Sequence, residues 1–110
     1  MKQDEVIAAL SALAQDSRLD VFRLLVEAGP DGLAAGEIAR RLGLPNSSLS
    51  FHLAQLQQGG LIAQRRDGRS LIYSADFACM DALIGFLTAN CCQGEECDAT
   101  RPARLTETCK

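Results

Sequence analysis

The stretch LPNSSLSFHLAQLQQGGLIAQRRDGRSLIYS, residues 44–74, decides how this 110-residue chain folds. The apolar positions of its first half share one helical face: Leu49, Leu53 and Leu56. The opposite face carries Ser47, Phe51, Ala54 and Gln58, and Gly59 ends the pattern. Two short apolar-rich runs follow, 61–65 and 69–74, joined by an Asp-Gly turn that is typical of hairpins. We therefore expect a helix over 46–58 followed by a β-hairpin.

Apolar periodicity predicts three helices before this stretch and one after it. The segments are EVIAALSALA (5–14), RLDVFRLLVEA (18–28), LAAGEIARRL (33–42) and FACMDALIGFLTAN (77–90). The first segment places Val6, Leu10 and Leu13 on its apolar stripe. Two short helices joined by a tight glycine-containing turn, then a basic hairpin, form the layout of a winged helix-turn-helix. The expected fold is mainly α, with about five helices and a two-stranded wing.

Charge is distributed unevenly along the chain. In total, 11 Lys or Arg face 14 Asp or Glu, for a net charge of −3. Residues 38–75 hold five arginines and one acid, Asp67, which gives +4, so the remaining six basic and thirteen acidic residues give −7. Because salt screens each charge beyond roughly 8–10 Å, the local excess decides the attraction to phosphate. The basic middle therefore favours nucleic-acid binding despite the acidic total.

The outer face of the predicted helix 46–58 suits the major groove of DNA. Its hydroxyls and amides can approach base edges and phosphates, and its N-terminus offers free backbone N–H groups. The candidate DNA-binding residues are Ser47, Ser48, Ser50, His52 and Gln55 on the helix, with Arg65, Arg66 and Arg69 on the hairpin. An ordinary solvated hairpin and a locally packed histidine explain single residues equally well. Their coincidence in one acid-poor stretch favours double-stranded operator DNA as the partner.

Residues 5–92 resemble the ArsR/SmtB family of metal-responsive repressors. The motifs that carry the resemblance are Ser50-x-His52-Leu53, Gly60-Leu61, and Arg66-Asp67-Gly68-Arg69 with Tyr73 after it. The resemblance implies a homodimer in which the first and last helices form the interface and each subunit reads one half-site. Many members place arginine between the serine and the histidine of the helix, where this chain has Phe51.

The cysteine usage and the N-terminus indicate a compartment. The N-terminus MKQDEVIAAL lacks the basic flank of a secretory signal, and no stretch approaches membrane-spanning length. We therefore expect a cytoplasmic protein with no membrane partner. Thiols stay reduced there, so the five cysteines, at 79, 91, 92, 97 and 109, favour soft-ion binding or redox sensing over a disulfide framework.

Members of the family bind their effectors at different sites, and for two of these sites this chain lacks the ligating residues. The cysteine pair that some relatives carry in the first helix of the reading pair is missing from 33–42, and the histidine that others carry in the last helix is missing from 77–90. Three thiols remain, Cys91, Cys92 and Cys97, and a glycine-containing loop can bring the third back to the pair. A subgroup of arsenic-sensing relatives is similar at these positions.

Trivalent arsenic prefers three thiolates, so the expected effector is arsenite or the related antimonite, and its binding is expected to release DNA. We expect residues 1–97 to form one winged-helix and dimerisation domain with its cysteine cluster, and 98–110 to be a mobile tail. Cys79 is expected to be a small buried residue and Cys109 a bystander.

Other functions remain open at this point. A thiol-based redox-sensing repressor would close a disulfide under oxidation, although acids at 95, 96 and 98 disfavour free thiolate. A sensor of divalent Cd, Pb or Zn would expel about one proton per thiol, whereas arsenite would release essentially none. The cysteines can also be an incidental cysteine-rich tail. A winged-helix protein-interaction module or a thiol-based metal buffer, without operator recognition, would bind no DNA at physiological salt. An enzyme with a catalytic cofactor is disfavoured, because one histidine and no convergent acid–base set leave little catalytic material.

Overall fold

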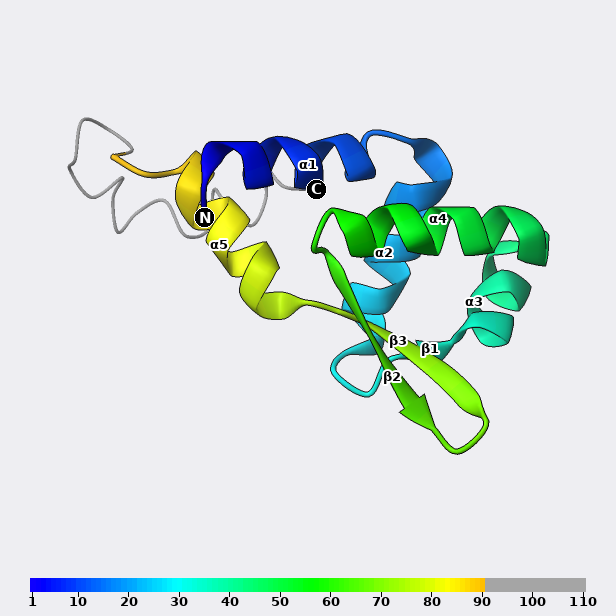
Figure 1. Ribbon diagram of the computed structural model, residues 1–110. Coiled ribbons are helices and arrows are strands. Elements are labelled where there is room, and N and C mark those ends of the chain that lie inside the picture. The colour runs from blue at the N-terminus through cyan, green and yellow to red at the C-terminus, as the bar shows by residue number, and fades with distance from the viewer. Residues whose placement is uncertain (91–110) are drawn as a thin grey trace.

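The computed structural model describes residues 1–90, so the predicted effector ligands Cys91, Cys92 and Cys97 and the segment 98–110 lie outside the described residues. The described elements, labelled in Figure 1, are α1 (Gln3–Leu13), α2 (Asp16–Ala28), β1 (Leu33–Ala34), α3 (Ala35–Leu42), α4 (Asn46–Gln58), β2 (Ile62–Asp67), β3 (Ser70–Ala75) and α5 (Phe77–Leu87). The predicted winged helix-turn-helix is confirmed, with α3 and α4 as the helix pair and β2–β3 as the wing.

The sheet has one strand more than the sequence predicts. Its antiparallel order is β1-β3-β2, and β1 joins by pairing Leu33 with Tyr73 and Ala34 with Ile72. The wing is a hairpin as predicted and pairs from Ile62↔Ala75 at its base to Asp67↔Ser70 at its tip. Its turn is formed by Gly68 and Arg69, because β2 continues to Asp67, beyond the predicted end of the run 61–65. A strand of two residues is too short to produce a period-two pattern, which explains why sequence periodicity missed it.

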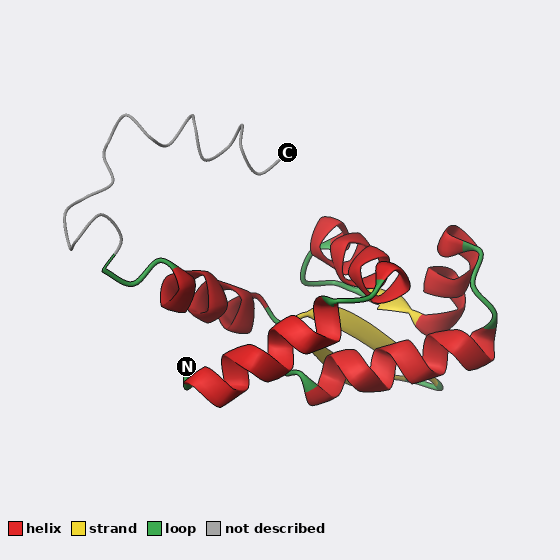
Figure 2. Ribbon diagram, turned by 90° about the horizontal axis from the view of Figure 1, so that it is seen from above, coloured by secondary structure: helices red, strands yellow, loops and turns green. Residues whose placement is uncertain are grey.

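The core lies where the helices pack on the sheet. Seen from above in Figure 2, the three strands lie beneath the helices. The largest fully buried side chains are Val21, Leu25, Ile38, Leu49, Leu56 and Leu61. The predicted apolar stripe of α4 therefore faces inward, and each buried leucine stabilises the fold by roughly 1.5–3 kcal/mol. That packing leaves the opposite face of α4 in solvent.

A glycine allows β1 to approach β3. Gly32 has φ +72°, and a Cβ at this position would lie 2.3 Å from the carbonyl oxygen of Tyr73. Only a residue without a side chain can therefore occupy position 32 in this conformation. The preceding residue also ties the wing, because the Arg65 guanidinium donates to the Asp31 carbonyl oxygen at 3.1 and 3.3 Å.

The α1 helix crosses the end of α4 at very short range. A Cβ on Gly59 would lie 3.0 Å from the Cβ of Ala12 and 3.2 Å from the carbonyl oxygen of Ala8. Small side chains fill the contact, since the buried residues of α1 are Val6, Ala9 and Ala12. The larger side chains of this helix consequently point elsewhere.

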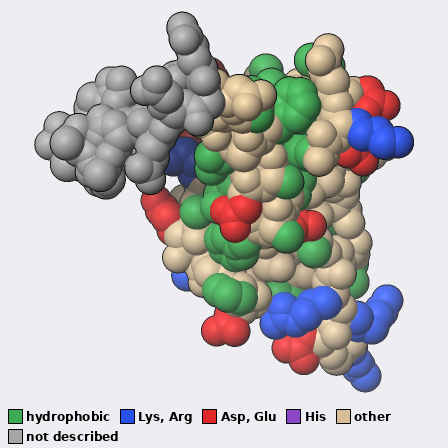
Figure 3. All heavy atoms as spheres, turned by 90° about the vertical axis from the view of Figure 1, so that its left-hand side faces the viewer, with side chains coloured by type: hydrophobic (Ala, Val, Ile, Leu, Met, Phe, Trp, Pro, Cys, Tyr) green, Lys and Arg blue, Asp and Glu red, His purple; other side chains and the backbone are tan. Residues whose placement is uncertain are grey.

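The helices α1 and α5 expose apolar side chains that the core does not use. Ile7 is 56% exposed on α1, while Ile84 and Leu87 are 53% and 58% exposed on α5. Figure 3 shows hydrophobic side chains gathered on the side of the molecule where α5 and the beginning of α1 lie. No helix within residues 1–90 is long and apolar enough to cross a membrane. The exposed apolar side chains of α1 and α5 form what we call the α1–α5 face.

Candidate DNA-binding surface

The outer face of α4 presents small polar side chains at its centre. Of the predicted residues, Ser47 and Ser50 are exposed. Ser48, His52 and Gln55 are half-buried, because they flank the leucines that enter the core. The helix begins after Pro45, and neither a side-chain cap nor an acidic residue occupies its first turn. Its first backbone N–H groups are therefore free to meet a phosphate.

His52 contributes less charge to this surface than its sequence position suggests. Its Nδ1 is buried without a hydrogen-bond partner within the described residues. Burial, and then the nearby Arg18, lower the pKa of His52 below its ordinary value. A neutral imidazole is therefore expected at neutral pH, so the histidine adds no net attraction for phosphate.

The three predicted wing arginines fall into two groups. All are exposed, but Arg65 is held by the Asp31 carbonyl oxygen at the base of the wing. Within residues 1–90, no hydrogen bond or ion pair engages Arg66 or Arg69, which lie on either side of the wing tip. A hydrogen bond from Gln57 Nε2 to Gln64 Oε1, at 3.0 Å, fixes the wing relative to the end of α4. The wing can therefore present two uncommitted cations at a fixed position.

Glu37, an acid that the charge count leaves out, offsets one of the two positive charges of the α3 arginines. Glu37 precedes the basic stretch 38–75 by one position and accepts hydrogen bonds from Arg40 and from Arg41, the latter at 2.6 Å. Hydrogen bonds from these two arginines hold the pKa of Glu37 below its ordinary value. The α3 helix therefore keeps a net charge of +1 from two paired arginines, whereas Arg66 and Arg69 of the wing have no partner within residues 1–90.

Two further residues belong to this surface. The sequence places Phe51 on the outer face without deciding between a core residue and a contact to a thymine methyl group, and it gives no sign of Arg18. Phe51 is 58% exposed on the outer face of α4. The guanidinium of Arg18, which lies near the start of α2, sits 6.0 Å from the centroid of its ring. Nothing in the periodicity of either segment brings α2 next to α4, so only the fold reveals this pair.

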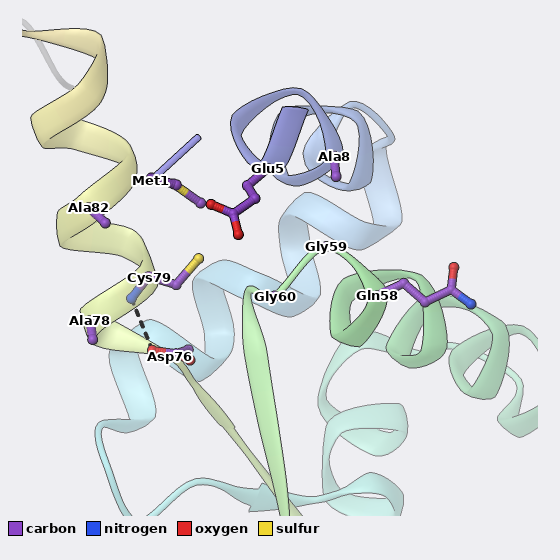
Figure 4. A pocket seen from close by; sticks show the side chains of 10 residues that line it. All are labelled: Met1, Glu5, Ala8, Gln58, Gly59, Gly60, Asp76, Ala78, Cys79 and Ala82. Atoms are coloured by element: carbon purple, nitrogen blue, oxygen red, sulfur yellow. Dashed lines mark hydrogen bonds between the residues drawn. The ribbon is translucent and has the colours of Figure 1, made fainter. Parts of the chain in front are cut away.

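Cys79 faces a pocket of about 470 Å³ between α1, the end of α4 and the beginning of α5 (Figure 4). It is half-buried, and its pKa is raised, first by burial and then by the charges of Asp76 and Glu5. The thiol therefore stays protonated and weakly reactive. Within the described residues no three His, Cys, Asp or Glu side chains could together hold a metal ion. The predicted cysteine cluster lies beyond Asn90, the last described residue.

Comparison with known proteins supports the same assignment of elements. Residues 13–65 match the family described as "Helix-turn-helix domain", a range that contains α3, α4 and the first part of the wing. The HTH-type transcriptional regulator YgaV of Escherichia coli is 34% identical over 84 residues, which cover 76% of this chain and 83% of that protein.

Two solved structures extend the likeness to most of the chain. HlyU of Vibrio cholerae, which is named a transcriptional activator, is 30% identical with a TM-score of 0.64, over 84% of this chain and 99% of that one. The Mycobacterium bovis fragment Mb0332 is 28% identical with a TM-score of 0.63, over 86% and 88% of the two chains. That fragment is described as a homodimeric winged helix-turn-helix DNA-binding domain and a "possible ArsR-family transcriptional regulator".

Proposed function

The chain belongs to the ArsR/SmtB family of winged helix-turn-helix transcriptional regulators, and from this premise we propose that it is a dimeric repressor which leaves its operator when arsenite or antimonite binds. One observation carries the DNA-binding part of this proposal. The exposed face of α4, with its uncapped N-terminus, lies in the same subunit as a wing whose Arg66 and Arg69 have no partner within residues 1–90. Such a surface supplies base contacts and phosphate contacts together.

The α1–α5 face supports the dimer. A free subunit would leave Ile7, Ile84 and Leu87 more than half exposed, and covering them with the same face of a second copy removes that apolar area from water. The homodimeric description of Mb0332 points the same way. Two copies of α4 held about 34 Å apart would meet successive major grooves on one side of DNA.

Repression is the direct consequence of such binding. A dimer that occupies a promoter blocks transcription without further machinery. Because HlyU is named an activator, the direction of regulation needs its own test. Transcription from a promoter that carries the operator is expected to fall when the protein is added and to recover with arsenite. An increase on adding the protein alone would contradict repression.

The effector part of the proposal rests on the donor set Cys91, Cys92 and Cys97, which begins four positions after the last residue of α5. Three thiols suit a trivalent, soft ion, and a reducing cytoplasm, where we place the protein, would keep them available. Their capture by one ion would restrain the chain next to α5, which contributes to the α1–α5 face. A coupling of about 1–3 kcal/mol between this site and the dimer would weaken operator binding roughly 5- to 150-fold.

The test is a release titration with the reduced, full-length protein. A duplex that the protein selects from random DNA serves as the operator, and arsenite, antimonite, cadmium, zinc and peroxide are added separately. We expect release by arsenite and antimonite. Release by peroxide alone would favour the redox alternative, and release by cadmium or zinc with proton loss would favour a divalent-metal sensor.

Single serine variants locate the effector site. Cys91→Ser, Cys92→Ser and Cys97→Ser are each expected to keep operator binding and to lose the response to arsenite. Cys79→Ser is the matched control, because its thiol is protonated and belongs to no described ligand group. Loss of the response in Cys79→Ser, or a full response in the other three variants, would contradict the assignment.

A further inference from the structure

Phe51 is an aromatic side chain that lies outside the buried core. The apolar side of α4 is supplied by Leu49, Leu53 and Leu56, all of which are buried. Phe51 instead stands 58% exposed among the small, exposed side chains of Ser47, Ser50 and Ala54. An exposed phenyl ring keeps apolar surface in water, so it gains most from a ligand that covers it.

The ring is also held in place. His52 meets it in an edge-to-face arrangement, with centroids 5.8 Å apart and planes at 61°, while the Arg18 guanidinium lies 6.0 Å from its centroid. Arg18 is itself anchored, since its Nε donates to the Ala12 carbonyl oxygen at 2.8 Å. Because the ring is oriented before any partner arrives, little side-chain freedom remains to be lost on binding.

We propose that Phe51 is a specificity-determining residue that contacts the C5-methyl group of a thymine in the major groove. This inference rests on the proposed DNA-binding function. Thymine alone among the four bases presents a methyl group in that groove, and phenylalanine is one of the side chains that meets it. The neighbours of Phe51 on α4 are hydroxyls and a single methyl, which fit a groove of polar base edges better than a broad apolar protein surface.

The experiment removes one methyl group at a time from the DNA. The full-length protein first selects its duplex from a random library, and each thymine of that duplex is then replaced singly by deoxyuridine, which lacks only the methyl. We expect the wild-type protein to lose roughly four-fold in affinity at one thymine of each half-site, the factor that one buried methyl gives. Phe51→Ala is expected to bind the thymine and deoxyuridine duplexes equally well.

Matched variants separate this effect from general weakening. Phe51→Leu keeps an apolar contact and is expected to keep part of the discrimination. Arg66→Ala should bind both duplexes more weakly while leaving their ratio unchanged, because it acts on phosphate. Urea unfolding checks that Phe51→Ala folds normally, as expected for a side chain that is 58% exposed.

Arg18 acts here as a positioning residue for the ring. Arg18→Ala is expected to lower the ratio of thymine to deoxyuridine affinity, and Arg18→Lys, which keeps a cation, is expected to restore part of it. An unchanged ratio in Arg18→Ala would overturn the positioning role.

The outcomes distinguish this inference from the proposed function. If the protein enriches no duplex from the library, operator binding fails and the inference falls with it. If it binds a selected duplex but is insensitive to every thymine replacement, or if Phe51→Ala keeps the full wild-type sensitivity, only the role of Phe51 is overturned.

Discussion

The outer face of α4 and the α1–α5 face are both exposed helical surfaces, but their side chains suit different partners. On α4, the exposed side carries hydroxyls and a single held phenyl ring, and cations from the wing lie in the same subunit. On the α1–α5 face, the exposed side chains are large and aliphatic, with Ile84 and Leu87 more than half in solvent. A surface that meets phosphate keeps its charges hydrated, whereas a surface that meets its own copy is most stable when charge is excluded. The net charge of −3 for the whole chain therefore predicts neither the cations beside α4 nor the apolar character of the α1–α5 face.

The largest expected effect comes from placing a charge on the α1–α5 face. Ile84→Glu is expected to dissociate the dimer. Ile84 is 53% exposed in one subunit, so its burial in the dimer gives about half of the roughly 1.5–3 kcal/mol of full burial, or about 1.5–3 kcal/mol for the two symmetry-related copies. The variant also places two carboxylates in an apolar contact. Sedimentation equilibrium measures the change in mass, and operator affinity should fall with it. Phe51→Glu is the matched control on the other face and should remain dimeric while losing DNA. A dimeric Ile84→Glu would place the subunit contact elsewhere.

The second prediction removes cations from the reading face. The double variant Arg66→Ala, Arg69→Ala is expected to bind the operator roughly a hundred-fold more weakly at physiological salt, and to flatten the dependence of log K on log salt by about 0.9 for each lost phosphate contact. Fluorescence anisotropy at several salt concentrations gives both numbers. Arg40→Ala serves as the comparison, since Glu37 already pairs with Arg40. An equal loss of slope in that variant would show that the pairing with Glu37 does not keep Arg40 from phosphate.

The third prediction concerns the base of the wing. Gly32→Ala is expected to lower the free energy of unfolding by at least about 2 kcal/mol, because φ +72° is strained for alanine and its Cβ would meet the Tyr73 carbonyl oxygen at 2.3 Å. Urea unfolding measures the loss. Gly36→Ala, where a Cβ meets open space, should cost nothing and can gain up to about 1 kcal/mol. Similar stability in the two variants would contradict the packing of β1 on β3.

The smallest expected effect is a pH dependence of stability that belongs to His52. Its folded pKa lies below the unfolded value of about 6.5, so the unfolded chain binds the proton more readily. The stabilisation is therefore complete above pH 6.5 and is lost as the pH falls below that value. We expect less than about 1 kcal/mol, since the group is half-buried. Unfolding at pH 7.5 and 5.5 should show a smaller change for His52→Gln than for the wild type.

Much of the reading face follows from local pattern. The three leucines of α4 and the Asp-Gly turn predict the helix at 46–58 and the wing close to its observed strands. The contacts of Glu37 with Arg40 and Arg41 also follow from pattern, because they have the i,i+3 and i,i+4 spacings of a helix. The bond from Arg65 to Asp31 and the placement of Arg18 over Phe51 do not, because no spacing rule selects these partners.

In α1, periodicity is right for two of the three predicted inward side chains, because Val6 is buried and Leu13 packs against the core. Its pattern favours Val6, Leu10 and Leu13 as the inward stripe, but Leu10 is 37% exposed while Ala9 is fully buried. The reason is the short approach of α1 to Gly59, which admits only small side chains. A hydrophobicity scale ranks leucine above alanine as a core residue. It therefore cannot predict a contact in which the available space, rather than the apolar area, decides which side chain is buried.

The effector ligands Cys91, Cys92 and Cys97 stay a prediction from the sequence.

The contact at Gly59 also links the two faces mechanically. With only a hydrogen atom on α4 between the two backbones, a rigid-body displacement of α1 cannot be absorbed there by a change of rotamer. A rearrangement of the quaternary structure would then reach α4 as a change in its tilt. A bulkier residue at position 59 is therefore expected to change the tilt of α4. The coupling between the subunit contact and DNA binding would then change even in a protein that still folds.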